Sequence, residues 1–158
     1  MIRKQGVAIV NVGTICTRDI VVCRRDTTAL DAARLIRKHQ VGDLVVIDDS
    51  NSKQTPVGII TDSDIVVSVV AKEVDPAAVF VSDMMSAPLV TACDWEDLWQ
   101  VIRRMRLHGM RRMPITNDAD ELVGIVTFDD LVAAMSVLLT ELAQVSGREK
   151  TLDEMSRK

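Results

Sequence analysis

Two stretches of the chain carry nearly the same sequence: residues 57–67 read VGIITDSDIVV, and residues 123–133 read VGIVTFDDLVA. When the two are aligned, six of the eleven positions are identical. Each copy is a β-branched apolar run, then Thr-x-x-Asp, then a second apolar run, which predicts a buried strand followed by a helix. The repetition indicates that the chain contains two copies of one supersecondary unit.

The Thr-x-x-Asp spacing has two physical interpretations. Thr61 with Asp64, and Thr127 with Asp130, have the spacing of a capping box, in which the hydroxyl accepts from an early helix N–H and the carboxylate reaches back. The same geometry suits a ligand, because free N–H groups and a hydroxyl at a helix start attract a phosphate and a nearby carboxylate binds a ribose diol. Spacing alone favours the capping role and leaves the ligand role open.

The composition is typical of a globular protein with an aliphatic core. The 158 residues are 47% hydrophobic, 27% charged and only 3% aromatic. The net charge of −4 argues against general nucleic-acid binding, and no apolar run approaches the ~20 residues of a membrane span. The basic and then apolar residues 1–10 lack a clean signal-peptide cleavage site, so we expect a cytoplasmic protein.

The sequence offers no set of residues typical of a metal site or of catalysis. Cys16, Cys23 and Cys93 have neither zinc-site spacing nor the pattern of a disulfide framework, and we interpret them as buried thiols. The Asp-rich turns at 48–52 and 117–121 lack the spacing of a calcium-binding loop. No nucleophile–base pair and no Gly-rich phosphate loop is found. We therefore expect neither a metal site nor an enzyme.

Other elements recur around the repeated stretches. The first copy is expected to begin with a strand, a helix capped by Thr28, and a second strand, at residues 20–23, 28–38 and 43–47. The second copy is expected to begin with a strand, a helix capped by Asp94, and a second strand, at residues 89–91, 95–107 and 112–116. Each unit therefore reads strand–helix–strand–strand–helix, which is an α/β arrangement.

The last helix is longer than such a unit requires. It carries an apolar stripe of Leu131, Met135, Leu138, Leu139 and Leu142, and we expect part of this stripe to be a homodimer surface. The two copies are expected at residues 14–73 and 81–145. The polar residues 146–158 are expected to form a frayed tail.

The duplicated pattern resembles the cystathionine β-synthase-type (CBS) domain pair, also called a Bateman module. The resemblance covers about residues 14–145. Its main feature is the Gly-h-h-Thr-x-x-Asp turn, where h is apolar, at residues 58–64 and again at 124–130. The other matching features are the entry to the Pro114 strand at 111–115, the segment before the second copy at 83–88, and the helices at 28–38 and 95–107. The resemblance implies tandem β-α-β-β-α repeats that pack sheet to sheet around a pseudo-twofold axis. It also implies two clefts that bind adenosyl nucleotides.

The resemblance implies roles for particular residues in these clefts. The Asp of each turn would bind the ribose hydroxyls, the Thr would lie near the phosphate, and the linker and the strand entry would surround the adenine. One cleft is expected to contain Met85, Ser86, Pro88, Arg111, Arg112, Met113, Pro114, Thr127 and Asp130. The other is expected to contain Cys16, Thr17, Ile20, Gly42, Asp43, Leu44, Thr61 and Asp64.

The two clefts are not expected to be equivalent. When Pro114 is aligned with Val45, Arg112 corresponds to Asp43, and the first copy lacks the strand proline of the family. A guanidinium neutralises a phosphate, whereas a carboxylate repels one. We therefore expect AMP, ADP or ATP in the cleft that contains Arg112, with NAD and S-adenosylmethionine as less favoured ligands.

Three functions are compatible with the sequence. The leading hypothesis is a regulatory homodimer that binds an adenine nucleotide and signals to a protein partner in trans, with no nucleic-acid or membrane partner. The second is a structural module that binds no ligand and assembles through its last helix. The third is nucleic-acid binding through the arginines of residues 103–112, which the acidic total and the scarcity of stacking aromatics disfavour.

Overall fold

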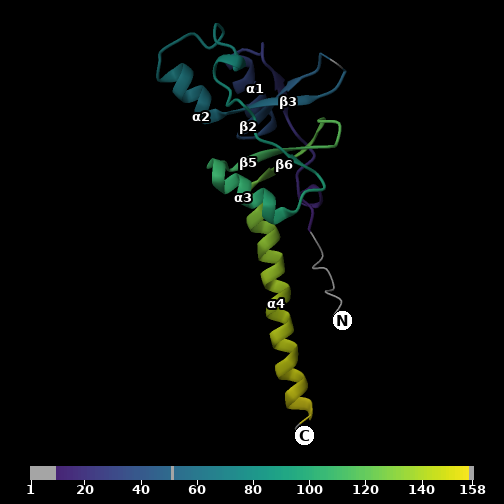
Figure 1. The fold of residues 1–158 in the computed structure, drawn as a ribbon. Helices are drawn as coiled ribbons and strands as arrows, with labels where there is room; N and C mark the ends of the chain where they lie inside the picture. The colour runs from purple at the N-terminus through teal and green to yellow at the C-terminus, as the bar shows by residue number, and fades with distance from the viewer. Residues whose placement is uncertain (1–9, 51, 157–158) are drawn as a thin grey trace.

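The computed structural model describes residues 10–50 and 52–156, with the side chains of residues 146–156 left undescribed. It consists of two three-stranded sheets with their helices, and of one long helix that extends away from both sheets (Figure 1). The N-terminal residues 1–9 and the last two residues lie outside this range. Within the described residues, no helix combines the length and apolar character needed to cross a membrane.

The first repeat has the predicted order of elements. These are β1 (Val22–Arg24), α1 (Ala29–His39), β2 (Asp43–Asp48), β3 (Thr55–Thr61) and α2 (Asp62–Ile65), which continues as a π-helical turn over Val66–Val70. Strand β2 lies in the middle of the sheet, parallel to β1 and antiparallel to β3. Thr28 caps α1 as the spacing predicts, since its hydroxyl accepts from the Asp31 N–H.

The second repeat has the same topology. Its elements are β4 (Ala92–Cys93), α3 (Leu98–His108), β5 (Arg112–Thr116), β6 (Leu122–Thr127) and α4 (Phe128–Ser156). Strand β5 lies between β4 and β6, with the same parallel and antiparallel pairings as in the first sheet. The registers are equivalent, because Asp43 pairs with Thr61 and Arg112 pairs with Thr127. The predicted duplication is therefore confirmed at the level of individual residue pairs.

Three predicted boundaries in the second repeat are wrong. Strand β4 lies at Ala92–Cys93 and not at residues 89–91. Helix α3 is capped by Asp97 and not by Asp94, because residues 94–97 form a turn in which the Cys93 N–H donates to the Glu96 carboxylate. Helix α4 continues to Ser156 instead of ending at residue 145. Residues 148–155 are rich in helix formers, including Arg, Glu, Lys, Leu and Met, so the polar stretch has the propensity to continue the helix.

Each repeat has its own aliphatic core, and a third apolar cluster joins the two sheets. Val45 and Ile47 of β2 pack there with Ile125 of β6, and partly buried neighbours come from both repeats: Ile20, Val22, Ile59 and Leu122. The two repeats therefore pack sheet to sheet, as the resemblance implies.

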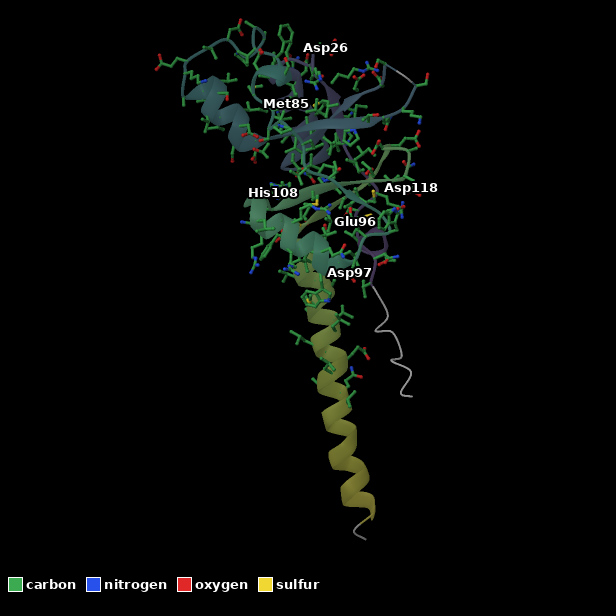
Figure 2. The ribbon with its side chains drawn as sticks, viewed as in Figure 1. Asp26, Met85, Glu96, Asp97, His108 and Asp118 are labelled. Atoms are coloured by element: carbon green, nitrogen blue, oxygen red, sulfur yellow. The ribbon has the colours of Figure 1, made fainter. Side chains whose placement is uncertain are left out.

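The segments that precede the two repeats cross over. Val12 lies in the core of the second repeat, whereas Val81 lies in the core of the first. Thr17 forms an antiparallel bridge with Ile125, and Ser86 forms the equivalent bridge with Ile59. Figure 2 accordingly places Met85 beside the first repeat. Each repeat is thus completed by the segment that comes before the other one.

This crossing explains the glycine of the repeated motif. A Cβ on Gly124 would lie 2.5 Å from Cys16 Sγ and 3.2 Å from the Thr17 carbonyl oxygen. A Cβ on Gly58 would lie 2.6 Å from Met85 Sδ. Only a residue without a side chain lets the crossing segment lie directly against the strand.

We therefore expect Gly124→Ala to destabilise the fold by about 1–3 kcal/mol through overcrowding. The cost should fall in a Cys16→Ala background, because that change removes the nearest atom, Cys16 Sγ. Urea unfolding of the four proteins of this double-mutant cycle measures the coupling. An equal cost in both backgrounds would contradict the proposed role of the close approach.

Candidate functional site

Two clefts open where the repeats meet. The first, which we call the Thr61 cleft, has a volume of about 320 Å³. Its lining comes mostly from the second repeat and the segment before it: Ile59, Thr61, Ser86, Pro88, Leu89, Val90, His108, Gly109, Met110, Arg111 and Arg112. The cleft therefore combines apolar residues with hydroxyl groups and cationic side chains.

The second cleft, which we call the Thr127 cleft, is smaller, with a volume of about 210 Å³. Its lining comes mostly from the first repeat and the segment before it: Thr17, Asp19, Ile20, Val21, Val41, Gly42, Asp43, Ile125, Thr127 and Asp130. The polar side chains of this cleft are hydroxyl groups and carboxylates.

The expected grouping of residues into clefts is wrong in one respect. Thr61 shares its cleft with Ser86, Pro88, Arg111 and Arg112, whereas Thr127 and Asp130 share theirs with Thr17, Ile20, Gly42 and Asp43. The prediction assigned each Thr to the strand entry of its own repeat. The crossing segments and the sheet-to-sheet packing place it against the strand entry of the other repeat.

Some predicted site residues belong to the packing around the clefts and do not line either one. Met85 and Cys16 pack against the motif glycines. Three other residues at the strand entries are fully buried in the protein interior: Leu44, Met113 and Pro114. Side chains alternate along a strand, so Leu44 and Met113, next to Asp43 and Arg112, point into the cores of their own repeats, whereas Pro114 lies on the same face as Arg112. Asp64 also lines neither cleft.

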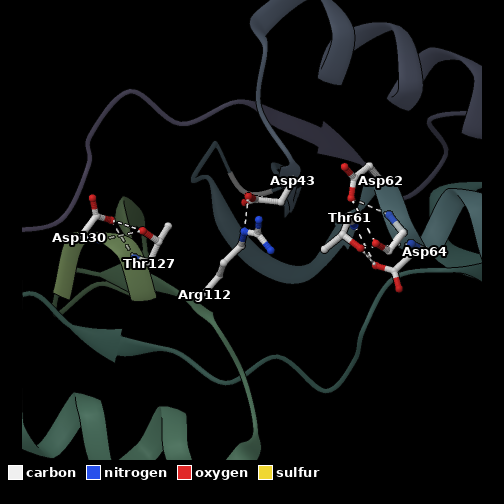
Figure 3. A network of polar contacts seen from close by, with 8 residues as sticks. Asp43, Thr61, Asp62, Asp64, Arg112, Thr127 and Asp130 are labelled. Atoms are coloured by element: carbon white, nitrogen blue, oxygen red, sulfur yellow. Dashed lines mark hydrogen bonds and ion pairs between the residues drawn. The ribbon is translucent and has the colours of Figure 1, made fainter. Parts of the chain in front are cut away.

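Both Thr-x-x-Asp motifs form the predicted capping contacts (Figure 3). The Oδ2 atom of Asp64 accepts from the Thr61 N–H and hydroxyl, both at 2.8 Å, and Asp130 Oδ2 accepts from Thr127 at 2.8 and 2.7 Å. Each Thr hydroxyl also accepts from its Asp N–H at 3.2 Å. The Oδ1 atoms of Asp64 and Asp130 accept no hydrogen bond from any residue that the structure describes. Each aspartate therefore keeps one oxygen for a ligand.

An ion pair lies between the two clefts. Arg112 Nε donates to Asp43 Oδ1 at 2.5 Å, and the side chains are 35% and 15% exposed (Figure 3). The two residues begin the equivalent strands β5 and β2, so the pair joins matching positions of the two repeats. Burial raises the pKa of the Asp43 carboxyl, and the guanidinium of Arg112 opposes this rise only in part.

A polar groove of about 400 Å³ at this ion pair shares lining residues with both clefts. Both motif threonines line it, together with Asp43, Asp62, Ser63, Arg111, Arg112, Phe128 and Asp129. Arg111 lies over the ring of Phe128, with 5.2 Å from its Cζ to the ring centroid. The two arginines are therefore placed between the start of α2 and the start of α4.

Several lining residues were not predicted from the sequence. In the Thr61 cleft they are Ile59, Leu89, Val90, His108, Gly109 and Met110, and in the Thr127 cleft they are Asp19, Val21, Val41 and Ile125. The apolar ones look like ordinary strand residues in the sequence. His108 has a local explanation, because its ring contacts the Arg104 carbonyl oxygen at the end of α3.

Arg104 and Cys23 have structural roles, whereas Cys16 and Cys93, expected to be buried thiols, are only partly buried. Arg104 forms an ion pair with Glu96 at 2.7 Å and donates to the Thr91 carbonyl oxygen, so the arginine-rich stretch is not a continuous free basic surface. Burial raises the pKa of Cys23 to about 12, which keeps the thiol protonated and unreactive. Among the described residues, no His, Cys, Asp and Glu side chains cluster closely enough to hold a metal ion.

Comparison with known proteins agrees with this geometry. The CBS domain profile matches residues 12–71 and 81–137. The uncharacterised protein MK0525 of Methanopyrus kandleri is 33% identical over 135 residues, which cover 85% of this chain and 67% of that protein. The chain is therefore a member of the CBS domain family, and it contains two CBS repeats.

Solved structures show the same fold. An uncharacterised conserved protein from Pyrococcus horikoshii is 28% identical, with a TM-score of 0.70 over 82% of this chain and 95% of that one. The CBS domain pair of protein MJ0100, solved in complex with 5′-methylthioadenosine and S-adenosyl-L-methionine, is 24% identical, with a TM-score of 0.70 over 81% of this chain and 97% of that one.

The Asp43–Arg112 pair is expected to make the stability of the fold depend on pH. Because the pKa of Asp43 is raised in the folded state, the unfolded chain ionises first, and the wild type should lose stability as the pH rises from 3.8 toward the raised pKa. Asp43→Asn removes this loss, so its stability relative to wild type should increase over that interval. At pH 7 the two should differ by no more than about 1 kcal/mol, because the pair is partly exposed.

Arg112→Gln is the opposing variant, since it leaves Asp43 without its cation. The loss of stability with rising pH should then be larger than in the wild type. Urea unfolding at pH steps from 3.5 to 7 measures both effects. Identical pH profiles for the wild type and Arg112→Gln would contradict the assigned ion pair.

Proposed function

We propose that this CBS pair is a cytoplasmic, non-catalytic regulatory module that binds AMP, ADP or ATP in the Thr61 cleft. The observation that carries the proposal is the convergence of Arg111 and Arg112 with the hydroxyl of Ser86 in one cleft that also has an apolar wall. Guanidinium and hydroxyl groups recognise phosphate. An apolar wall accommodates a purine ring.

Each part of the nucleotide has a counterpart in the cleft or directly beside it. We assign the adenine to the apolar residues Pro88, Leu89, Val90 and Met110. The ribose hydroxyls are assigned to Oδ1 of Asp64, which does not line the cleft itself but is held beside it, because its Oδ2 accepts from the lining residue Thr61. The phosphates are assigned to Arg111 and Arg112. The adenosyl ligands named for the CBS pair of protein MJ0100 support this ligand class.

The same arrangement suits regulation. The Thr61 cleft takes Ile59 and Thr61 from the first repeat and the strand entry at Arg111 and Arg112 from the second. A ligand that contacts both repeats binds best to one relative position of the two and shifts the population toward it. We propose that a protein partner in trans reads this shift.

Titration calorimetry with AMP, ADP, ATP, NAD and S-adenosylmethionine tests the proposal. Asp64→Asn keeps an oxygen for the helix cap but removes the carboxylate charge from the ribose contact. It should weaken AMP binding by at least about 10-fold, because hydrogen bonds to charged groups contribute about 1.5–3 kcal/mol. Asp130→Asn is the matched control and should leave AMP affinity unchanged. Equal losses in both variants would contradict the assignment of AMP to the Thr61 cleft.

We also propose that the chain forms a homodimer through α4. Leu131, Met135, Leu138, Leu142 and Val145 follow one another at alternating steps of four and three residues, which is the spacing of a coiled-coil seam. Leu131 is buried in the core of the second repeat. Beyond it the seam emerges from the domain, and Leu142 is 67% exposed.

Leu142→Glu should therefore convert the dimer to a monomer, because it places a charge in the centre of the seam. Thr140→Glu is the matched control on the same helix, outside the seam, and should remain dimeric. Sedimentation equilibrium of the two variants measures the difference. A Leu142→Glu dimer would contradict the proposed interface, and a dimer that binds no nucleotide would favour the assembly function.

A further inference from the structure

Arg112 lies between the two clefts. It lines the Thr61 cleft, while its Nε donates to Asp43, which lines the Thr127 cleft. Its Nη2 atom lies 3.1 Å from the position that a Cβ on Gly42 would occupy, and Gly42 also lines the Thr127 cleft. The wall between the two clefts therefore contains a single guanidinium–carboxylate contact.

The charges on the two sides of this wall are opposite. Among the described lining residues, the Thr61 cleft has the cations Arg111 and Arg112 and no acidic side chain. The Thr127 cleft has Asp19, Asp43 and Asp130 and no basic side chain. A phosphate is attracted to the first environment and repelled by the second, whereas a cation has the reverse preference.

We propose that the Arg112–Asp43 contact couples the two clefts, so that a phosphorylated adenosine in the Thr61 cleft and a cationic adenosyl ligand in the Thr127 cleft strengthen each other's binding. This inference rests on the proposed function, because it assigns ligands to the same two clefts.

The coupling follows from the competition for Arg112. A phosphate that accepts hydrogen bonds from the guanidinium draws it away from Asp43, whose side chain is only 15% exposed and which also faces the charge of Asp62. A partly buried carboxylate without its cation is costly. A cation in the Thr127 cleft removes that cost, because it takes the place of Arg112 beside Asp43. Each ligand therefore raises the affinity for the other by the same factor, since coupling between binding sites is reciprocal.

The same contact sets the stoichiometry for a single ligand type. A second phosphate in the Thr127 cleft would face Asp19, Asp43 and Asp130 without a basic lining residue. AMP on its own is therefore expected to bind with one molecule per chain. The smaller volume of the Thr127 cleft also suits a ligand without phosphates.

Three ligands with the same nucleoside and different charge at the 5′ position test the coupling: AMP, adenosine and 5′-amino-5′-deoxyadenosine. Calorimetry compares the binding of the amine and of adenosine to the free protein and to the protein saturated with AMP. Saturation with AMP should tighten the amine by at least about 5-fold, the lower end of typical coupling between sites. Adenosine should show no such gain. Competition for the Thr61 cleft would weaken the amine, so tightening reports on the Thr127 cleft.

Asp43→Asn should abolish the tightening and keep or improve AMP affinity, because Arg112 then has no competing carboxylate. Asp129→Asn is the matched control, since it removes one negative charge from the same groove without touching the ion pair, and it should keep the tightening. If AMP binds but does not tighten the amine, or if Asp43→Asn keeps the effect, the coupling is overturned and nucleotide binding stands. If no adenosyl ligand binds, both proposals are overturned.

Discussion

The close approach of two crossing segments to the motif glycines is the contact on which the rest of the structure depends. The chain before each repeat crosses to the other one, where Thr17 bridges to Ile125 and Ser86 bridges to Ile59. Each crossing segment then supplies one wall of the cleft on the repeat that it has reached. Because the repeats exchange these segments, neither repeat has a complete core or a complete cleft without its partner.

The pseudo-symmetry of the backbone is not matched by symmetry of charge. Asp43 and Arg112 begin equivalent strands with equivalent registers, and both motifs form the same capping box. The opposite charges of Asp43 and Arg112 give the two clefts different electrostatic environments, and the ion pair between them joins the two repeats. A duplicated unit has thus acquired two distinct sites while its hydrogen-bonding framework has stayed the same.

The repeat, the order of elements and the capping boxes could be predicted from the sequence because they depend on local spacing. Thr61 shares a cleft with Arg112, and Thr127 shares one with Asp43, because of the way the two repeats face each other, and local spacing does not encode this arrangement. The cap at Asp97 was missed because Asp94 also fits a capping pattern, and only the turn through Glu96 decides between them. The ion pair was missed because its members were assigned to separate clefts.

The length of α4 has a mechanical consequence. Its 29 residues begin directly after Thr127 and are continuous with the wall of the groove, where Phe128 contacts Arg111. At 1.5 Å per residue the helix is about 44 Å long, so a tilt of about 5° at its base moves its far end by about 4 Å. A side-chain rearrangement near the ion pair that tilted the helix would thereby be amplified into a displacement of several ångströms at its far end.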